Sequence, residues 1–343
     1  MAEEVWMLQT KKADFKQIGA RFRIDPVTAR IIRNRGIEGE AAIDRYLNGT
    51  LDDLYDPMLL KDMERAVSIL CEAVDTGKKI RIVGDYDIDG VCSTYILLQA
   101  FERLGSDVDF EIPDRIKDGY GINESIIEQA HADGVEVILT CDNGISAFHQ
   151  VELAKKYGMT VVITDHHEVP LDGEKEKIPP ADAVIDPKQA DCPYPFPEIC
   201  GAVVAYKLVQ VLYARRGVPQ MEWLDLLEFA AIATVGDVMK LQDENRILVK
   251  YGLKKMAQTK NLGLRRLAEK NNLDLGAITA YHIGFVIGPC LNAGGRLKTA
   301  KEALALLRAQ SEEEAERLAE ELKELNDTRK DMTEQGTEAA KLQ

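Results

Sequence analysis

Acidic side chains and two histidines stand directly after three short apolar runs of this 343-residue sequence. Each run is rich in β-branched residues and is followed by a helical pattern, which is typical of strands in βαβ units. Because the carboxyl ends of parallel strands meet at one edge of a sheet, these side chains should converge there. The residues concerned are Asp85, Asp87 and Asp89 after the run at 79–84, Asp142 after 135–141, and Asp165, His166 and His167 after 160–164.

Clustered carboxylates favour a divalent metal site at this edge. Carboxylates held a few Å apart repel one another and must retain protons unless a counter-ion lies among them. Oxygen ligands with one or two imidazoles suit Mn²⁺ or Mg²⁺ better than zinc, which prefers thiolates. Taken singly, an aspartate after a strand can be a helix N-cap, Asp89-Gly90 a turn and His166 a loop histidine. Three acidic strand ends together predict a metal site.

A further acid, Asp237, ends a run of small apolar residues at 229–236. The run predicts a closely packed helix, and a buried carboxylate at its end needs a partner such as a metal ion. A plain turn residue after the helix would explain the position equally well, so both interpretations stay open.

Strands and helices alternate regularly between residues 77 and 185. The helical stretches cover 91–104, 124–133 and 146–157, and further strands are expected at 108–112 and 183–185. This alternation predicts an α/β fold with a mostly parallel five-stranded sheet and flanking helices.

Three parts are expected along the chain. Residues 1–69 form a helical N-terminal segment, in which Asp25-Pro26 marks a helix start. Residues 70–308 form the main domain, helical throughout after residue 201, and residues 309–343 form a long charged connecting helix. We expect this last helix to lead towards a further domain that is absent from the sequence. Its apolar positions are Ala315, Leu318, Ala319, Leu322 and Leu325.

Two segments of the main domain are predicted to be surface connections. Residues 171–180 are rich in Gly, Lys, Glu and Pro, and residues 191–197 contain three prolines. Such residues interrupt helices and strands, so the first segment is expected to be a surface loop and the second a stiffer connection.

Composition excludes several classes of protein. No apolar run is long enough to span a membrane, and the N-terminus lacks a secretion signal. The 6 cysteines form no C-x-x-C pair, which indicates reduced thiols in a cytoplasmic protein. The net charge of −15 disfavours nucleic acid, yet residues 1–36 carry eight Lys and Arg against four acids.

Four segments resemble, in order, the motifs of the DHH phosphoesterase superfamily. Their sequences are similar to those of the RecJ family of single-strand-specific 5′→3′ DNA exonucleases. The segments are 85–90 (DYDIDG), 142–144 (DNG), 165–167 (DHH) and 235–241 (VGDVMKL). Residues 113–121, 200–208 and 291–297 also resemble RecJ segments, so the likeness runs from about residue 56 to residue 329.

The resemblance implies a role for individual residues. It places two Mn²⁺ or Mg²⁺ ions on Asp87, Asp89, Asp142, His166 and Asp237, with Asp142 bridging them. It assigns Asp85 and His167 to the catalytic groups around the scissile phosphate. It implies phosphate and DNA contacts by Arg115, Asn292 and Arg296, because guanidinium groups engage two phosphate oxygens at once.

Two positions depart from the family pattern. Cys290 stands where an arginine is usual, so one basic contact is expected to be missing or supplied elsewhere. Val203 replaces a usual glycine, which we expect to change only the packing. The family's DHHA1 and oligonucleotide-binding domains are not in this sequence, so strong, processive DNA binding is not expected.

The activity implied by the resemblance is two-metal phosphodiester hydrolysis that releases 5′-mononucleotides from single-stranded DNA. It also implies work in DNA repair and recombination, with a single-strand-binding protein and a helicase as cellular partners and no membrane. Two alternatives stay open. A DHH phosphodiesterase of short oligonucleotides or cyclic dinucleotides would share the metal motifs. A non-catalytic replication scaffold would show eroded ligands, whereas every motif acid and both histidines are present here.

Overall fold

The computed structural model describes residues 7, 11–115, 119 and 121–341. Its main sheet has five parallel strands in the order β2-β1-β3-β4-β7, which confirms the predicted fold class. The strands are β1 (Ile80–Val83), β2 (Val108–Glu111), β3 (Val137–Cys141), β4 (Thr160–Thr164) and β7 (Ala183–Ile185).

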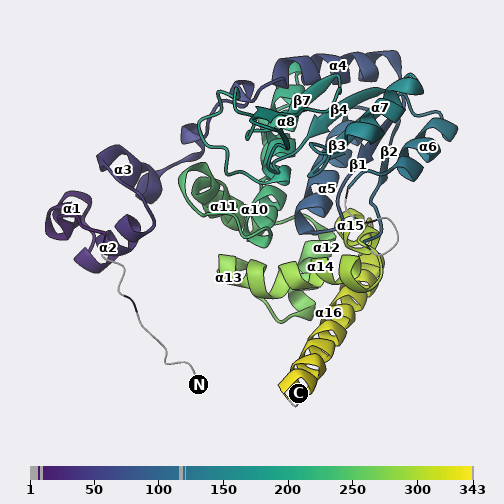
Figure 1. Cartoon of the computed structure of the whole chain (residues 1–343). Helices are drawn as coiled ribbons and strands as arrows, with labels where there is room; N and C mark the ends of the chain where they lie inside the picture. The colour runs from purple at the N-terminus through teal and green to yellow at the C-terminus, as the bar shows by residue number, and fades with distance from the viewer. Residues whose placement is uncertain (1–6, 8–10, 116–118, 120, 342–343) are drawn as a thin grey trace.

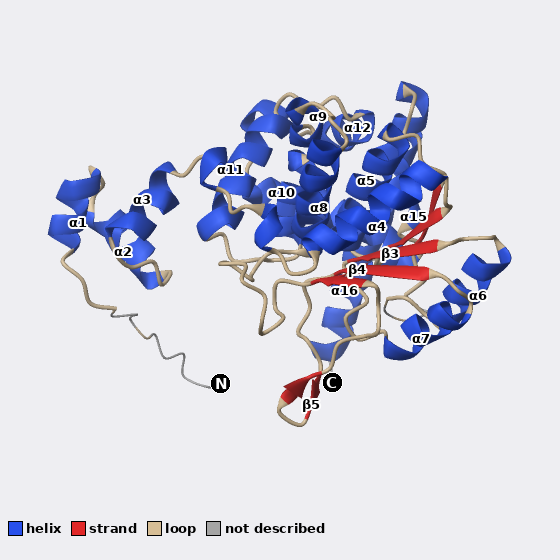
Figure 2. Ribbon diagram, turned by 90° about the horizontal axis from the view of Figure 1, so that it is seen from above, coloured by secondary structure: helices blue, strands red, loops and turns tan. Residues whose placement is uncertain are grey.

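Helices cover both faces of the sheet because its inner strands are apolar on both sides. Ile80 and Ile82 of β1 belong to the larger hydrophobic core, whereas Val83 points into a second one. The larger core lies under α4 (Met63–Thr76), α5 (Ile88–Arg103) and α8 (Gly201–Arg215). The second lies under α6 (Glu124–Ala132) and α7 (Phe148–Lys156). Figure 2 shows β3 and β4 between these two helical layers.

The order of the strands places a crevice at the end of β1. The chain leaves β1 through α5 to reach β2 on one side, and then crosses through α6 to β3 on the other. The loops that follow β1 and β3 therefore diverge, and open parallel sheets bind ligands at such a point. The residues after β1 and β3 lie at this crevice.

The second half of the main domain is helical, as predicted for residues 201–308. Its elements before the last helix are α9 (Gln220–Leu224), α10 (Leu227–Gly236), α11 (Asp243–Met256), α12 (Leu262–Lys270), α13 (Ala280–His282), α14 (Gly288–Leu297) and α15 (Lys301–Arg308). A π-helical turn, η4 (Ile283–Ile287), joins α13 to α14 and was not predicted. Short 3-10 turns lie at η1 (Leu51–Asp53), η2 (Pro57–Leu59) and η3 (Leu275–Ala277).

The long last helix, α16 (Glu312–Lys341), packs along α12 and α14. Four of its five predicted apolar positions are buried and the fifth, Leu325, is partly buried against the core. The side-chain amide of Asn326 is buried and lies 3.6 Å from Sγ of Cys290 on α14. From residue 330 to 341 the helix is exposed, and Figure 1 shows this part projecting from the body.

The N-terminal helices form a small unit at one side of the molecule (Figure 1). They are α1 (Phe15–Phe22), α2 (Pro26–Asn34) and α3 (Glu40–Asn48), and Asp25 caps α2 as predicted. The unit has its own hydrophobic cluster around Ile32 and Ile43. It contacts the main body through Arg45, whose Nε lies 2.8 Å from Oδ1 of Asp243.

The structure also refines the predicted divisions. The boundary expected at residues 69 and 70 falls inside α4, whose Met63 and Leu70 belong to the main core. The predicted loop at 171–180 instead contains a hairpin of β5 (Leu171–Asp172) and β6 (Lys175–Glu176), because Gly173 adopts the positive φ of 66° that its turn requires. Figure 2 shows this hairpin projecting from the body.

Two predictions from composition can be compared with the structure. All six cysteines are free and five of them are buried, as expected for thiols that form no disulfide. Among the helices of the described ranges, none combines the length and the apolar character needed to cross a membrane.

Candidate metal centre

The loop after β1 places Asp85 and Asp87 at the crevice. Asp87 is the N-cap of α5, and its Oδ1 accepts hydrogen bonds from the backbone N–H groups of Asp89 (2.9 Å) and Gly90 (3.1 Å). This fixes the carboxylate at the positive end of the helix. Asp85 is buried, and its Oδ1 has no hydrogen-bond partner in the part of the chain that the structure describes.

Asp89 joins two helices at the floor of the site. Its Oδ2 accepts a hydrogen bond from the N–H of Gly201 (2.6 Å), and its Oδ1 accepts one from the N–H of Ala202 (2.7 Å). Both donors belong to the first turn of α8, so the side chain ties α5 to α8. Each carboxylate oxygen has a second lone pair, which leaves Asp89 able to bind a cation as well.

Asp142, directly after β3, has a left-handed backbone with a φ of 61°. Aspartate tolerates this region better than most residues. The next residue, Asn143, holds the loop: its amide donates to the carbonyl oxygens of Val83 (3.0 Å) and Cys141 (2.9 Å). Asn143 therefore links the ends of β1 and β3, and fixes the loops that follow these strands relative to each other.

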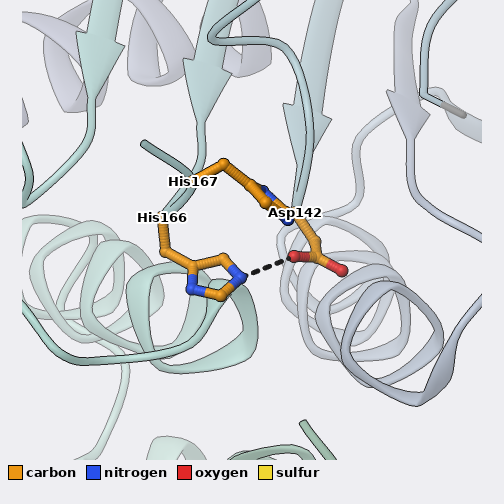
Figure 3. Close-up of side chains that lie close together, drawn as sticks. All are labelled: Asp142, His166 and His167. Atoms are coloured by element: carbon orange, nitrogen blue, oxygen red, sulfur yellow. Dashed lines mark ion pairs between the residues drawn. The ribbon is translucent and has the colours of Figure 1, made fainter. Parts of the chain in front are cut away.

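His166, after β4, faces three carboxylates from three other elements. Its Nε2 lies 3.1 Å from Oδ1 of Asp142, 3.4 Å from Oδ2 of Asp89 and 3.8 Å from Oδ2 of Asp237. Figure 3 shows His166 and Asp142 pointing toward each other beyond the ends of their strands. Asp237 is the C-cap of α10 and is partly buried, with 29% of its side chain exposed.

His167 is oriented by the fully buried Asp165. Oδ1 of Asp165 lies 2.7 Å from Nδ1 of His167, and its Oδ2 accepts the N–H of Ile145 (2.9 Å). Burial opposes protonation of His167, but the contact with Asp165 outweighs it and raises the pKa of His167 to about 9. The imidazole is thus a fixed positive group beside Asp142 at neutral pH.

The carboxylates of the site destabilise one another's charged forms. Burial, and then the charge of Asp87, raise the pKa of Asp85 to about 7. Burial, and then the charge of Asp89, raise the pKa of Asp237 to about 7. The pKa values of Asp87 and Asp142 are raised for the same two reasons, burial first. In this arrangement the carboxylates are not all ionised near neutral pH unless positive charge lies among them.

The arrangement fits a pair of divalent cations. Three sets of side chains each place their ligand atoms within 4.8 Å of one another. The sets are Asp85, Asp87 and Asp142; Asp89, His166 and Asp237; and Asp142, His166 and His167. Asp142 belongs to two of them. The donors are carboxylate oxygens and imidazole nitrogens, which suit Mn²⁺ or Mg²⁺. A cation among them would also remove the repulsion that raises the carboxyl pKa values.

A polar cavity of about 250 Å³ adjoins this centre. It is lined by Asp87 together with Arg115, Asn292 and Arg296, the three residues expected to contact phosphate. Oδ1 of Asn292 is buried and has no hydrogen-bond partner among the described residues. The guanidinium of Arg115 lies over the ring of Tyr86, 5.4 Å from its centroid. Residues 116–118 and 120 of the segment 113–121 lie outside the described residues.

This chain is similar in sequence to known proteins over most of its length. Residues 79–234 match the DHH family, N-terminal domain. RecJ from Bacillus subtilis is 37% identical over 336 residues, which cover 98% of this chain and 41% of that protein. RecJ from Escherichia coli is 36% identical over 330 residues, covering 93% of this chain and 56% of that one.

Two solved structures share the fold. A crystal structure of RecJ from Thermus thermophilus in complex with Mn²⁺ has a TM-score of 0.77 at 32% identity, covering 93% of this chain and 44% of that chain. A crystal structure of exonuclease RecJ bound to manganese has a TM-score of 0.72 at 35% identity, covering 80% of this chain and 68% of that chain. The chain belongs to the RecJ family. It spans about half of the length of the curated RecJ proteins that it matches.

The two residues that depart from the RecJ pattern, Cys290 and Val203, are both buried in helices. Cys290 is a buried residue of α14, and its Sγ lies 3.6 Å from Nδ2 of Asn326 and 3.8 Å from Nδ2 of Asn271. It packs toward α12 and α16 and does not line the phosphate cavity. Val203 is fully buried within α8, in keeping with the packing role expected for it.

Two residues that matter for the geometry of this RecJ site were not among the predicted site residues. Asp165 was noted only as part of an acidic strand end, although an acid directly before two histidines is a signal for a residue that orients one of them. Asn143 was noted only as a member of the segment 142–144, and its links to the ends of β1 and β3 depend on the register of the strands.

Replacing Asp165 by asparagine should free His167 and lower its pKa. A histidine whose pKa is raised in the folded state stabilises the fold below its unfolded pKa, and this contribution is lost as the pH rises through about 9. The loss of stability caused by Asp165→Asn in metal-free protein should therefore be larger at pH 6 than at pH 9.5. Urea unfolding at both pH values, with an NMR titration of His167, measures it. Equal losses at the two pH values would contradict the assigned pair.

Proposed function

We propose that this chain is the catalytic core of a metal-dependent exonuclease that degrades single-stranded DNA from its 5′ end and releases 5′-mononucleotides. One observation carries the proposal. Two sets of ligand atoms that share Asp142 lie at the switch point of the sheet, beside a cavity that holds Arg115, Asn292 and Arg296. This combination suits a phosphodiester whose scissile phosphate meets cations while arginines engage neighbouring phosphates.

Each side chain has a proposed task in this reaction. Asp87, Asp89, Asp142, His166 and Asp237 would hold two Mn²⁺ or Mg²⁺ ions, which when bound supply Lewis-acid activation of water and neutralise phosphate charge. His167, held by Asp165, would contact a non-bridging oxygen of the scissile phosphate, and the buried Asp85 would complete the polar shell. Arg115 and Arg296 would orient the strand for in-line attack.

Metal-bound structures of RecJ relatives support the choice of Mn²⁺ or Mg²⁺. One RecJ structure is described as bound to manganese, and two from Thermus thermophilus as complexes with Mn²⁺ and with Mg²⁺. The donor set of this chain has the same character, because the three sets consist of carboxylate and imidazole groups and include no cysteine of the described residues.

Digestion of a labelled strand tests the proposal. A 5′-phosphorylated single strand of about 20 nucleotides, labelled at its 3′ end, is incubated with the protein and Mn²⁺ or with EDTA. We expect stepwise shortening from the unlabelled 5′ end with Mn²⁺ and none with EDTA. Shortening from the 3′ end would contradict the polarity, and preferential cleavage of a cyclic dinucleotide in a competition assay would favour the small-substrate alternative.

The cellular setting is part of the same proposal. We place the protein in the cytoplasm, where its six free cysteines would stay reduced. A single-strand-binding protein and a helicase are the proposed partners, because both would present single strands to this site. Co-purification of either with the tagged protein, with and without nuclease treatment, would test a direct contact.

A further inference from the structure

Two aromatic side chains are exposed on the helical side of the molecule. Tyr281 is 64% exposed and Phe285 is 68% exposed. Their rings stack on each other, with centroids 4.9 Å apart and an interplanar angle of 27°. Contiguous exposed apolar side chains often mark a binding surface, and together the two rings form a flat apolar surface, which we call the aromatic platform.

The helical segment that carries the aromatic platform packs closely on residues next to the metal centre. Gly284, between the two rings in sequence, faces Val235 of α10, so that a Cβ at Gly284 would lie 3.7 Å from Cγ1 of that valine. Asp237, the C-cap of α10, follows two residues after Val235. One turn on, Gly288 packs on Ile88, which lies between Asp87 and Asp89, with a Cβ there 3.4 Å from Cδ1. The helical segment that carries the platform therefore packs against neighbours of the potential metal ligands at two separate points.

The same helical rod continues to the phosphate cavity. α13, η4 and α14 run without a break from residue 280 to residue 297. Tyr281 and Phe285 precede Asn292 and Arg296 on this one rod, with spacings of four, seven and four residues between them. Phe285 and Arg296 are 11 residues apart, or roughly 16 Å along the rod. A few nucleotides of an extended strand bridge such a distance.

The π-helical turn supports a role at the surface. Ile283 and Ile287 at its two ends are fully buried, whereas Phe285 at its centre points outward. π turns are strained relative to α-helix and are frequent at functional sites. This turn keeps Phe285 beside Tyr281 while the rod stays packed on α10.

We infer that the aromatic platform stacks on nucleobases of the single strand whose phosphates lie in the cavity of Arg115 and Arg296. The inference rests on the proposed function and extends it to a base-binding subsite. Aromatic rings hold the faces of all four bases, so such contacts give affinity without sequence preference. A double helix keeps its base faces stacked inside, so the platform also favours single strands.

A nucleobase fits this surface better than a protein partner does. The surface consists of two rings flanked by polar groups, among them Thr279, whose N–H donates to Nδ1 of His282 (3.1 Å). Stable protein interfaces bury on the order of 1,200 Å² or more, far beyond two side chains. The platform lies on the same helical rod as Asn292 and Arg296 of the phosphate cavity, as suits a strand in which bases and phosphates alternate.

Binding of oligonucleotides of two lengths tests the inference. In metal-free buffer, fluorescence anisotropy measures the affinity of the full chain for a 5′-phosphorylated 12-mer and for a dinucleotide. Replacement of Tyr281 or Phe285 by alanine should weaken binding of the 12-mer roughly tenfold per ring. The loss for the dinucleotide should be much smaller, because it does not reach the rings. Phe285→Trp, which keeps an aromatic ring, should bind the 12-mer with the affinity of wild type. The fluorescence of 2-aminopurine in the 12-mer should be quenched by wild type and not by the alanine variants.

Tyr157→Ala is the matched control. Tyr157 is exposed and stacks on His131 with centroids 4.2 Å apart, but it ends α7 on the far face of the sheet. Its removal should leave the affinity for both oligonucleotides unchanged, and thermal unfolding should show that all variants fold.

Several outcomes would overturn the inference. Unchanged affinity for the 12-mer would do so, as would equal losses for the two lengths, because equal losses indicate a disturbed phosphate cavity. A wild-type oligomer that the platform variants split into monomers would assign the surface to self-association instead. A wild type that binds the 12-mer through the platform but hydrolyses no DNA with Mn²⁺ would overturn the proposed function and support the platform.

Discussion

Replacing Asp142 by asparagine should lower metal-dependent hydrolysis of single-stranded DNA by about 10³-fold. Asp142 belongs to two of the three sets of potential ligand atoms, and its Oδ1 lies 3.1 Å from Nε2 of His166. Its loss therefore weakens both proposed cation positions at once. Asparagine is the suitable replacement because it keeps the size of the side chain and tolerates the left-handed backbone, with its φ of 61°. Rates of digestion in Mn²⁺ measure the effect.

The same variant should gain less stability from metal than wild type does. Burial and the neighbouring carboxylates raise the pKa of Asp142, so its ionisation destabilises the metal-free fold as the pH rises above 3.8. Without metal at pH 7.5, Asp142→Asn should thus unfold at a higher temperature than wild type. Added Mn²⁺ should raise the unfolding temperature of wild type much more than that of the variant. Equal gains in both proteins would show that Asp142 is not a ligand.

Asp191→Asn is the control for these measurements. Asp191 lies in an exposed connection and pairs with Lys61, 2.6 Å from its Nζ. It has no part in the three sets of ligand atoms. Its replacement should change neither the rate of digestion nor the gain in unfolding temperature with Mn²⁺.

Replacing Gly201 by alanine should cost about 10²-fold in activity, although this residue is not proposed to touch substrate. A Cβ at Gly201 would lie 2.7 Å from Cβ of Asp142 and 2.9 Å from its Oδ1, closer than side chains pack. Either Asp142 moves or α8 retreats, and in the second case the hydrogen bond from Gly201 to Asp89 is lost. Such overpacking also costs about 1–3 kcal/mol of stability. Digestion rates and urea unfolding measure the two effects.

Gly336→Ala is the control for Gly201→Ala, because it makes the same exchange of glycine for alanine far from the metal centre. Gly336 lies in the exposed part of α16, where a Cβ would meet no heavy atom within 4 Å. The exchange should stabilise the helix by about 1 kcal/mol and leave activity unchanged. If Gly201→Ala behaved in the same way, the close approach of α8 to Asp142 would be refuted.

Local sequence was enough to predict the sheet. The runs that became β1, β3 and β4 are short and rich in β-branched residues, and each is followed by a helical period, so the strands and their parallel order follow from general rules. Because parallel strands end at one edge, the convergence of Asp87, Asp142 and His166 could also be expected before any geometry was known.

Features that depend on contacts between distant segments were not predictable in this way. Nothing in the run at 85–90 indicates that Asp89 accepts hydrogen bonds from Gly201 and Ala202, more than a hundred residues away. The exposure of Asp237 depends on how α10 meets α5 and the π turn, which its own apolar run does not reveal. The β5–β6 hairpin was hidden by a composition typical of loops, because two-residue strands carry almost no periodicity.

The packing of α16 sets a minimum extent for an intact site. Asn326 of α16 supports Cys290 on α14, and α14 carries Asn292 and Arg296 into the phosphate cavity. Every buried side chain of α16 lies at or before Asn326, whereas residues 330–341 are exposed. A polypeptide shortened to residue 330 thus keeps every side chain of α16 that is buried in the structure. One shortened to residue 311 lacks α16, so α14 loses the helix that packs against it.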